Sequence, residues 1–348
     1  MYNAILIVSF GGPEKAEDVI PFLENVTGGR NIPADRLREV AEHYRHFGGK
    51  SPINDQCRAL IRALRKELDQ HKLNLPIYWG TRNWHPALAE TIRQMRDEGI
   101  RHALAFVTSA YSSYSSCRQY RENIADARAQ VGADAPHIDK LRAFYNHPGF
   151  IEASADRVRE TLAEFCESEM SNIRFVVSAH SIPSSMAETS DYQRQLRETA
   201  RLVAEAAGFV KWDLVFQSRS GPPAQPWLGP DILDHLKALH SQGVKGVLLA
   251  PLGFLSDHVE ILYDLDVEAS RLAQELGMKM LRAKTVGTHP AFIGMARQLI
   301  AERVLNEPQL AMGAYGPSDD VCPPDCCPAP QQAGRPLVLG DRSASQLP

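Results

Sequence analysis

The stretch GVLLAPLGFLSDHVEILYDLDVE (residues 246–268) indicates both the fold class and the position of a site. Its first half is an apolar run with the length of a buried strand, and its second half has the pattern of a helix. That helix carries Glu260, Asp264 and Glu268 at intervals of four residues, so the three carboxylates share one helical face. Like charges at this spacing repel each other, so the row needs an explanation. It is either a solvated acidic face near a helix start, where the helix dipole favours negative charge, or a path for a cation or protons at a strand end.

Similar apolar runs recur along the chain, and segments with helical periodicity separate most of them. Continuous apolar strands that alternate with amphipathic helices are typical of parallel sheets covered by helices on both faces. We therefore expect an α/β fold with two similar halves, each containing four strands. The expected strands span residues 4–10, 76–80, 103–109, 141–144, 174–180, 213–218, 246–254 and 279–283.

The length of 348 residues suits two domains of ordinary size. We expect an N-terminal domain over residues 1–148 and a C-terminal domain over residues 149–310, divided near the segment NHPGF (146–150). Residues 311–348 are rich in proline and lack periodicity, so we expect them to form an irregular tail. This tail holds three of the six cysteines.

Composition narrows the class of protein. A net charge of −4 and a pI near 6.3 give no electrostatic reason to expect nucleic acid as a partner. The beginning MYNAILIVSFGG lacks the basic region of a signal peptide, and no window approaches the roughly 20 apolar residues of a membrane span. We therefore expect a cytoplasmic protein, in which cysteines are thiols or metal ligands rather than disulfides.

The ends of the expected strands should hold the chemistry, because ligands of open α/β sheets bind beyond the carboxyl ends of the strands. His180 ends one expected strand, and Glu260 follows the end of another. If these two strands are neighbours, the imidazole and the carboxylate meet over one cleft. Such a pair suits a divalent ion such as Fe²⁺, and either group can accept a proton near neutral pH. His258 competes for this role, or it caps the helix beside Asp257.

The cysteines of the tail form a second candidate site. Cys322, Cys326 and Cys327 lie within six residues, a spacing unlike the CxxC pairs of zinc ribbons. An iron–sulfur cluster usually takes four cysteines, so a fourth ligand is needed. The candidates are Cys57, Cys117 and Cys166. Cys117 is favoured because it lies in the strand-end loop YSSCRQY, and the alternatives are zinc or an incidental cluster on a disordered tail.

In combination, several motifs resemble ferrochelatase, the enzyme that inserts ferrous iron into a porphyrin to make haem. They are SFGGPE, FLENVTGGR, HYRHFGGKSPIN, SAHSIP, QSRSGPPAQPWLGP and GFLSDHVEILYDLDVE. The segments FLENVTGGR and HFGGKSPIN and the cysteine tail look like the actinobacterial branch of that family. The resemblance implies two Rossmann-like, chelatase-like domains with a porphyrin cleft between them. For this branch it also implies coproporphyrin III as substrate and a [2Fe-2S] cluster as cofactor.

The resemblance also implies roles for single residues. His180 and Glu260 match the paired metal-site and catalytic residues, and Asp264 and Glu268 match an outer acidic row that leads iron in or protons out. The family positions that contact the porphyrin or its propionates are matched in this chain by Phe10, Arg30, Tyr44, Ser51 and Tyr120. Phenylalanine at position 10 offers no axial oxygen or sulfur to a metal. The cluster ligands implied are Cys117, Cys322, Cys326 and Cys327.

The implied reaction is insertion of Fe²⁺ into coproporphyrin III to give Fe-coproporphyrin III (coproheme) with release of two protons. A coproheme decarboxylase is the expected acceptor of the product, and the chain is expected to act as a monomer. The alternatives are a protoporphyrin IX ferrochelatase that makes protoheme directly, and a non-catalytic porphyrin or haem carrier. Two further rivals are a cobalt or nickel chelatase for sirohydrochlorin and an iron–sulfur sensor with a vestigial chelatase body.

Overall fold

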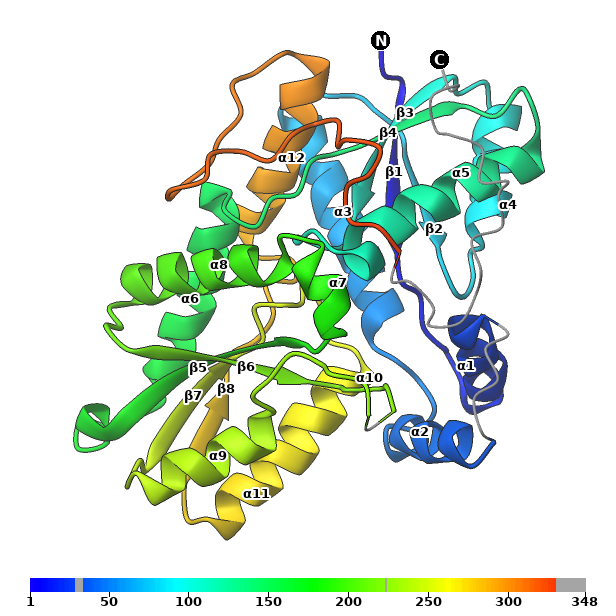
Figure 1. The fold of residues 1–348 in the computed structure, drawn as a ribbon. Coiled ribbons are helices and arrows are strands. Elements are labelled where there is room, and N and C mark those ends of the chain that lie inside the picture. Colours follow the sequence, from blue (N-terminus) through cyan, green and yellow to red (C-terminus); the bar gives the residue numbers. More distant parts are fainter. Residues whose placement is uncertain (29–33, 223, 330–348) are drawn as a thin grey trace.

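A computed structural model shows two four-stranded parallel sheets, each flanked by helices (Figure 1). The structure describes residues 1–28, 34–222 and 224–329. The first sheet has the strand order β2-β1-β3-β4 and the second has the order β6-β5-β7-β8. The strands are β1 Ala4–Ser9, β2 Ile77–Thr81, β3 His102–Val107, β4 His137–Lys140, β5 Ile173–His180, β6 Trp212–Gln217, β7 Gly246–Ala250 and β8 Lys279–Arg282. The predicted α/β class with two parallel sheets is confirmed.

Helices cover both faces of each sheet. The α-helices are α1 Val19–Thr27, α2 Ala34–His46, α3 Ile53–Gln70, α4 Leu88–Asp97, α5 Gln119–Val131, α6 Pro148–Leu162, α7 Ser184–Glu188, α8 Tyr192–Ala207, α9 Ile232–Ser241, α10 Val259–Ile261, α11 Ser270–Glu275 and α12 Pro290–Val304. Two short 3₁₀ turns are η1 Ala16–Asp18 and η3 Met170–Asn172. Two π-helical segments are η2 Tyr114–Arg118 and η4 Leu262–Ala269.

The side chains of each sheet alternate between two cores, because successive residues of a strand point to opposite faces. In β1, Ile7 lies in one cluster with α3, whereas Leu6 packs with α4 and α5 on the other face. In β5, Val177 lies with α6, α8 and α12, whereas Val176 packs with α9, η4 and α11. The uninterrupted apolar character of these strands in the sequence follows from this burial on both sides.

The core between the two sheets is continuous. The largest buried cluster contains residues of both sheets, and within it α12 packs against both α3 and α6. Buried Arg142, which follows β4, forms a bidentate ion pair with buried Glu302 of α12, with N–O distances of 2.7 and 2.8 Å. The division into domains 1–148 and 149–310 stays a prediction, because this core and this ion pair lie across it.

Six of the predicted strands agree with the structure to within two residues at each end, and two differ by more. The fourth strand is His137–Lys140, and the expected strand at 141–144 comes directly after it, where no strand is present. This strand is the edge of the sheet and is partly exposed, so it lacks the apolar run that marks the buried strands. The run 246–254 forms a strand only as far as Ala250, because the chain then turns at Pro251.

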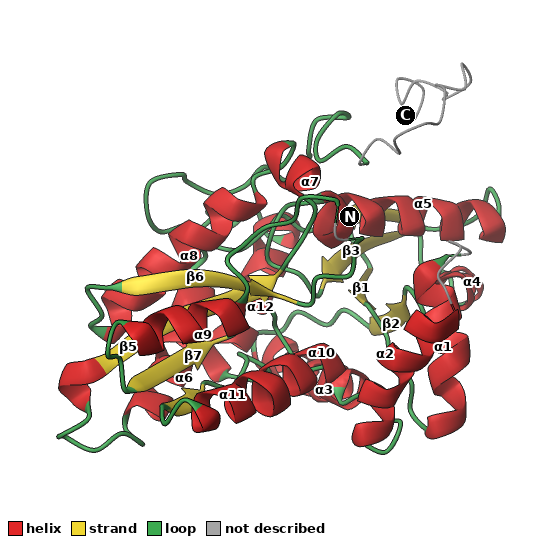
Figure 2. Ribbon diagram, turned by 60° about the horizontal axis from the view of Figure 1, so that its bottom comes forward, coloured by secondary structure: helices red, strands yellow, loops and turns green. Residues whose placement is uncertain are grey.

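A smaller layer lies beside the two sheets. Helices α1 and α2 share a buried cluster with Val259 of α10, and Figure 2 shows α10 beside α2. Residues 311–329 contain no helix or strand, as expected for the tail. Across residues 1–28, 34–222 and 224–329, no helix combines the length and apolar character that a bilayer crossing requires.

Candidate active site

His180 and Glu260 lie together at the carboxyl ends of two neighbouring strands. His180 is the last residue of β5, and Glu260 lies in α10, which follows β7. Strands β5 and β7 pair directly, which meets the condition under which the two side chains share one cleft. The imidazole Nε2 of His180 is 3.7 Å from a carboxylate oxygen of Glu260. A cation or a proton between these atoms would therefore meet a nitrogen lone pair and a negative oxygen.

A backbone contact orients the imidazole of His180. Its Nδ1 lies within hydrogen-bonding distance of the carbonyl oxygen of Ser181, and a carbonyl only accepts, so Nδ1 carries the proton. The other nitrogen, Nε2, then presents its lone pair toward Glu260. The hydroxyl of Tyr192 donates to the backbone oxygen of His180 at 3.0 Å and holds the strand end in place.

His258 is a second imidazole beside Glu260 rather than a helix cap. It occupies the position before α10, but its side chain makes no capping hydrogen bond. Its Nδ1 lies 3.8 Å from a carboxylate oxygen of Glu260, and its ring packs edge-on against Phe254. Burial lowers the pKa of His258, so this imidazole is neutral near pH 7. The Glu260 carboxylate is therefore flanked by nitrogen atoms on two sides.

The acidic row continues from Glu260 along the π-helical segment η4. Burial raises the pKa of Asp264 to about 7, and the negative charges of Glu260, Glu268 and Asp231 act in the same direction. The hydroxyl of Ser218 donates to Asp264 and opposes this shift. Burial also raises the pKa of Glu268. The row thus contains Asp264, whose pKa lies near neutral pH, and Glu268, whose pKa is raised above its ordinary value. It lies on a π-helical segment, and such segments are frequent at functional sites.

Four of the predicted porphyrin-contacting residues lie in the described part of the chain, and three of them are linked by aromatic and cationic contacts. The Phe22 ring lies edge-on to Phe10 and Tyr44, at centroid distances of 6.2 and 5.9 Å. The Arg82 guanidinium lies over the rings of Phe10 and Tyr120, at 5.6 and 4.7 Å. Burial raises the pKa of Tyr44, and the charge of Glu260 adds to the shift. Tyr44 also shares a buried cluster with Val259, the residue before Glu260.

Sequence reasoning missed Phe22 and Arg82. Arg82 directly follows β2, so the rule that ligands bind beyond strand ends could have found it. Phe22 lies within α1 and has the pattern of an ordinary core residue, so no signal marked it. Ser51 is buried against the glycine loop after β1, where a Cβ on Gly12 would come within 2.8 Å of its Cβ. Arg30 lies outside the described residues.

Comparison with known proteins decides the family. A family model described as ferrochelatase matches residues 2–304. The chain belongs to the ferrochelatase family. A protein of Rhodopirellula baltica named ferrochelatase is 53% identical over 98% of this chain and 97% of its own length. Proteins named coproporphyrin III ferrochelatase from Streptomyces coelicolor and Nocardia farcinica are 49% and 48% identical over 97% of this chain and 96% and 99% of their own lengths.

The folds of solved structures agree with this membership. The sirohydrochlorin chelatase SirB of Bacillus subtilis, solved with cobalt, superposes with a TM-score of 0.53. The match covers 88% of this chain and 97% of SirB, at 11% sequence identity. This likeness concerns the fold alone. It confirms the expected chelatase-like architecture of two sheets, and the ferrochelatase family model identifies the chain as a metal chelatase.

The cysteine tail lies beyond the part that matches the ferrochelatase model, and it docks on the π-helical segment η2. The Arg118 guanidinium donates to the backbone oxygens of Pro324 and Cys326, at 2.7 and 3.1 Å. A hydrogen bond joins the thiols of Cys322 and Cys117. The sulfurs of Cys326 and Cys327 are 3.5 Å apart. The structure thus gathers the four predicted cysteines.

The surroundings of this cysteine group favour the thiolate form of Cys117, whereas the hydrogen bond to Cys117 raises the pKa of Cys322 and burial raises the pKa of Cys327. The hydrogen bond from Cys322 and the positive charges of Lys140 and Arg121 lower the pKa of Cys117 to about 5. Thiolates are the form that binds metal ions and iron–sulfur clusters. Cys57 is instead buried in α3, where burial raises its pKa to about 12, and Cys166 is exposed elsewhere. The group therefore brings together soft sulfur donors, of which Cys117 is the one with a lowered pKa.

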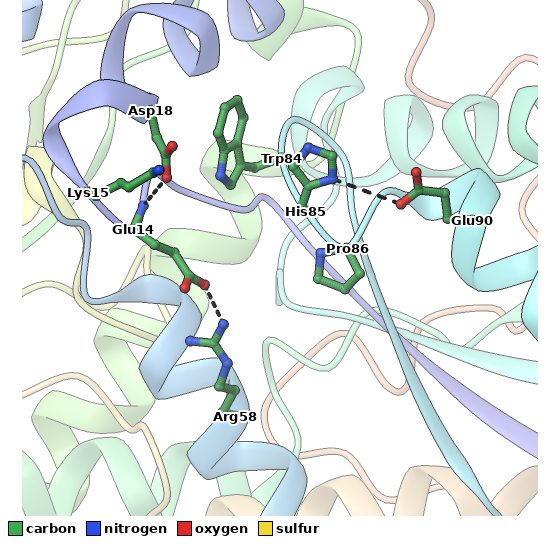
Figure 3. A pocket seen from close by; sticks show the side chains of 8 residues that line it. All are labelled: Glu14, Lys15, Asp18, Arg58, Trp84, His85, Pro86 and Glu90. Carbon is green, nitrogen blue, oxygen red and sulfur yellow. Dashed lines mark hydrogen bonds and ion pairs between the residues drawn. The ribbon is translucent and has the colours of Figure 1, made fainter.

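A separate open pocket of about 690 Å³ lies on the N-terminal half (Figure 3). Its lining is formed by Glu14, Lys15, Asp18, Arg58, Trp84, His85, Pro86 and Glu90. Trp84 connects it to the aromatic contacts above, since its ring lies edge-on to Phe22 at 6.1 Å. The polar groups of the pocket are largely paired with one another, for example Arg58 with Glu14. It does not include the His180–Glu260 pair.

Proposed function

We propose that this member of the ferrochelatase family inserts Fe²⁺ into coproporphyrin III and releases Fe-coproporphyrin III and two protons. The observation that carries the reaction is the imidazole of His180 facing the carboxylate of Glu260 across 3.7 Å, with Asp264 of raised pKa behind them. The substrate is supported by relatives named coproporphyrin III ferrochelatase that align over nearly the whole chain. Protoporphyrin IX as the substrate is the alternative.

Metallation requires that two pyrrole nitrogens lose their protons while the ion exchanges water for ring nitrogens. The lone pair on Nε2 of His180 and the carboxylate of Glu260 are the groups that receive the ion or accept these protons. Asp264 then takes a proton from this pair, because its pKa of about 7 lets it bind and release protons at neutral pH. Glu268, farther along η4, then passes the proton toward solvent.

The porphyrin is proposed to lie against the aromatic side of the site. Phe10, Tyr44 and Tyr120 supply ring surface, and Arg82 brings a cation next to two of these rings. A flat, apolar macrocycle with carboxylate substituents matches aromatic faces beside a guanidinium. We also propose contacts from Ser51 and Arg30. Phe10 carries no donor atom for the metal, so axial ligation from that residue is not part of the proposal.

We propose that Cys117, Cys322, Cys326 and Cys327 hold a [2Fe-2S] cluster. The fit rests on the gathered thiols and on the lowered pKa of Cys117. When bound, the cluster supplies a covalent clasp between the tail and η2. Insertion of Fe²⁺ needs no electron transfer, so no step of the metallation depends on the cluster.

Two further proposals concern the product and the assembly. A coproheme decarboxylase is proposed to accept the product, because protoheme carries two propionates and Fe-coproporphyrin III carries four. Two propionates must therefore lose their carboxyl groups. The chain is proposed to work as a monomer, because His180 and Glu260 come from one chain and meet without a partner.

An anaerobic optical assay tests the proposed reaction. The purified protein is mixed with Fe²⁺ and either coproporphyrin III or protoporphyrin IX, and the free-porphyrin bands are followed. Rapid loss of the coproporphyrin bands with slow loss of the protoporphyrin bands is expected. Faster use of protoporphyrin would overturn the substrate assignment. Binding of both porphyrins without metallation would identify a carrier instead of a chelatase.

A further inference from the structure

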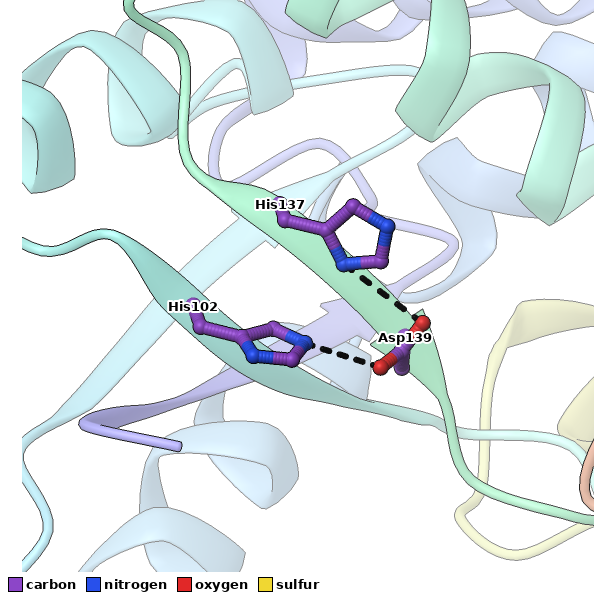
Figure 4. A group of neighbouring side chains, drawn as sticks. All are labelled: His102, His137 and Asp139. Atoms are coloured by element: carbon purple, nitrogen blue, oxygen red, sulfur yellow. Dashed lines mark hydrogen bonds and ion pairs between the residues drawn. The ribbon is translucent and has the colours of Figure 1, made fainter. Parts of the chain in front are cut away.

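Two histidines and an aspartate meet on the first sheet, at the ends of the strands that lie opposite the catalytic loops. His102 begins β3 and His137 begins β4, and the two are direct partners across the parallel pair. Asp139 lies two residues after His137, so both point to the same face of the sheet. Figure 4 shows the three side chains turned toward one another. The register of two strands thus creates the group.

We propose that His102, His137 and Asp139 form a second site for a divalent transition ion such as Zn²⁺, separate from the iron-insertion site. One ligand atom from each residue lies within 4.8 Å of the other two, and this is the one group of its kind among residues 1–28, 34–222 and 224–329. Two imidazoles and a carboxylate are a common ligand set for zinc and for ferrous iron. The remaining positions around the ion would be filled by water.

The distances match those of a tetrahedral ion. Ligand atoms at about 2.0–2.1 Å from such an ion lie roughly 3.3–3.4 Å from each other. In the structure, Nε2 of His102 is 2.9 Å from Oδ2 of Asp139, and Nδ1 of His137 is 3.6 Å from Oδ1. Small side-chain rotations therefore bring the three atoms onto one ion. The two imidazole rings lie 4.8 Å apart and nearly perpendicular, so both can approach it.

Neighbouring groups hold the carboxylate as outer-shell partners do in metal sites. The hydroxyl of Tyr2 donates to Oδ2 of Asp139 at 2.7 Å, and its ring packs on His102 at 4.2 Å. A cation also faces the site, since Nη2 of Arg303 lies 3.7 Å from the same Oδ2 and donates to the hydroxyl of Tyr2. Arg303 also pairs with Asp320 of the tail, so its charge is shared by two carboxylates. Oδ1 stays turned toward His137.

The site is distinct from the chelatase centre. His180 lies at the carboxyl end of β5 in the second sheet, whereas His102 and His137 open their strands in the first sheet. Because β4 is the edge strand, an ion here would join the edge to its neighbour and to the Tyr2 segment. An ion bound only by the folded chain raises its stability.

Zinc counting by equilibrium dialysis tests the proposal. The full chain is dialysed against Zn²⁺, and bound zinc is measured for wild type, His137→Ala and His71→Ala. His137 suits the test because its side chain is 52% exposed, so its loss leaves the core intact. His71 is the matched control, since it is 46% exposed and lies 3.5 Å from Glu67 without a second imidazole. Zinc held by the cysteines or by Glu260 contributes equally to every variant, so the difference between two variants reports the proposed site alone.

The expected result is one zinc ion fewer per chain in His137→Ala, and the wild-type count in His71→Ala. Zinc should also raise the melting temperature less in His137→Ala than in the control, while Fe²⁺ insertion without zinc stays equal in both. His102→Gln serves as a second variant if circular dichroism shows that His137→Ala is misfolded. Equal zinc counts in wild type and in a folded His137→Ala or His102→Gln variant would overturn the proposal.

Discussion

At the scale of single residues, we expect Asp264 to determine how the proposed reaction responds to pH. Its carboxyl group is buried and faces the charges of Glu260, Glu268 and Asp231, so it ionises only near pH 7. A carboxyl that titrates near the working pH is suited to accept and release protons. Below its pKa the group is protonated and accepts no further proton. Proton removal from the porphyrin should therefore slow as the solution becomes more acidic.

The variant Asp264→Asn tests this role through the pH profile. In the wild type we expect kcat for Fe²⁺ insertion to fall as pH drops through about 7. In Asp264→Asn this acid limb of the pH profile should disappear, and kcat at alkaline pH should be lower than in the wild type by about tenfold or more. Glu275→Gln, at the exposed end of the same helical stretch, is the control and should keep the limb. An unchanged limb in Asp264→Asn would contradict the assignment.

The same carboxyl group lowers stability at neutral pH. Its folded pKa lies above the unfolded value, so between about pH 4 and 7 the folded chain binds a proton that the unfolded chain has released. Stability therefore falls as pH rises through this window. Asp264→Asn should raise the melting temperature at alkaline pH by about 1–3 °C and have little effect near pH 4. Calorimetry that finds the same change at both pH values would argue against it.

The sequence indicated that His180 and Glu260 follow the ends of strands, and the structure brings them within 3.7 Å of each other because β5 and β7 pair. The catalytic roles of these residues and of the acidic row stay predictions. It left His258 between two roles, since the choice depends on a side-chain rotamer that the spacing does not determine. Phe22 and Arg82 act through contacts between elements far apart in sequence. Periodicity does not reveal such contacts, although the position of Arg82 directly after β2 could have marked that residue.

At the scale of elements, both π-helical segments belong to candidate sites: η4 carries the acidic row and η2 carries Cys117. The sequence predicted an ordinary helix over the acidic row. A π-helix differs from an α-helix in its i→i+5 backbone hydrogen bonds, which the side-chain pattern of so short a segment does not reveal. The shifted fourth strand has a related cause, because edge strand β4 has weak apolar patterning while the following segment is apolar and buried.

The docking of the tail on η2 can be weakened without touching a cysteine. Arg118→Ala removes two hydrogen bonds from the guanidinium to tail carbonyls. If the tail holds the proposed cluster, we expect chelators to bleach its visible absorption about fivefold faster in this variant, the equivalent of roughly 1 kcal/mol of lost hydrogen bonding. Arg128→Ala is the matched control, because Arg128 donates to Pro136 and not to the tail. Equal bleaching rates would show that Arg118 does not hold the tail.

At the scale of the whole molecule, the two sheets share one core, and the Arg142–Glu302 pair lies across the predicted domain boundary. Glu302→Ala leaves a buried guanidinium without its carboxylate, which should cost about 3–5 kcal/mol. Denaturant unfolding should show this loss within a single transition. Glu160→Ala breaks the more exposed pair with Arg157 and should cost about 0–1 kcal/mol. Similar losses in the two variants would mean that the buried pair does not hold the halves together.

The most direct test of the central claim is the rate of Fe²⁺ insertion into coproporphyrin III by Glu260→Gln, measured by anaerobic rapid mixing together with porphyrin affinity. Loss of the carboxylate that faces His180 should slow metallation by about 100-fold or more, because a positioned acid–base group contributes that much. Porphyrin affinity should stay within about threefold of wild type, since the aromatic contacts are untouched. A Glu260→Gln variant that inserts iron at the wild-type rate would contradict the claim.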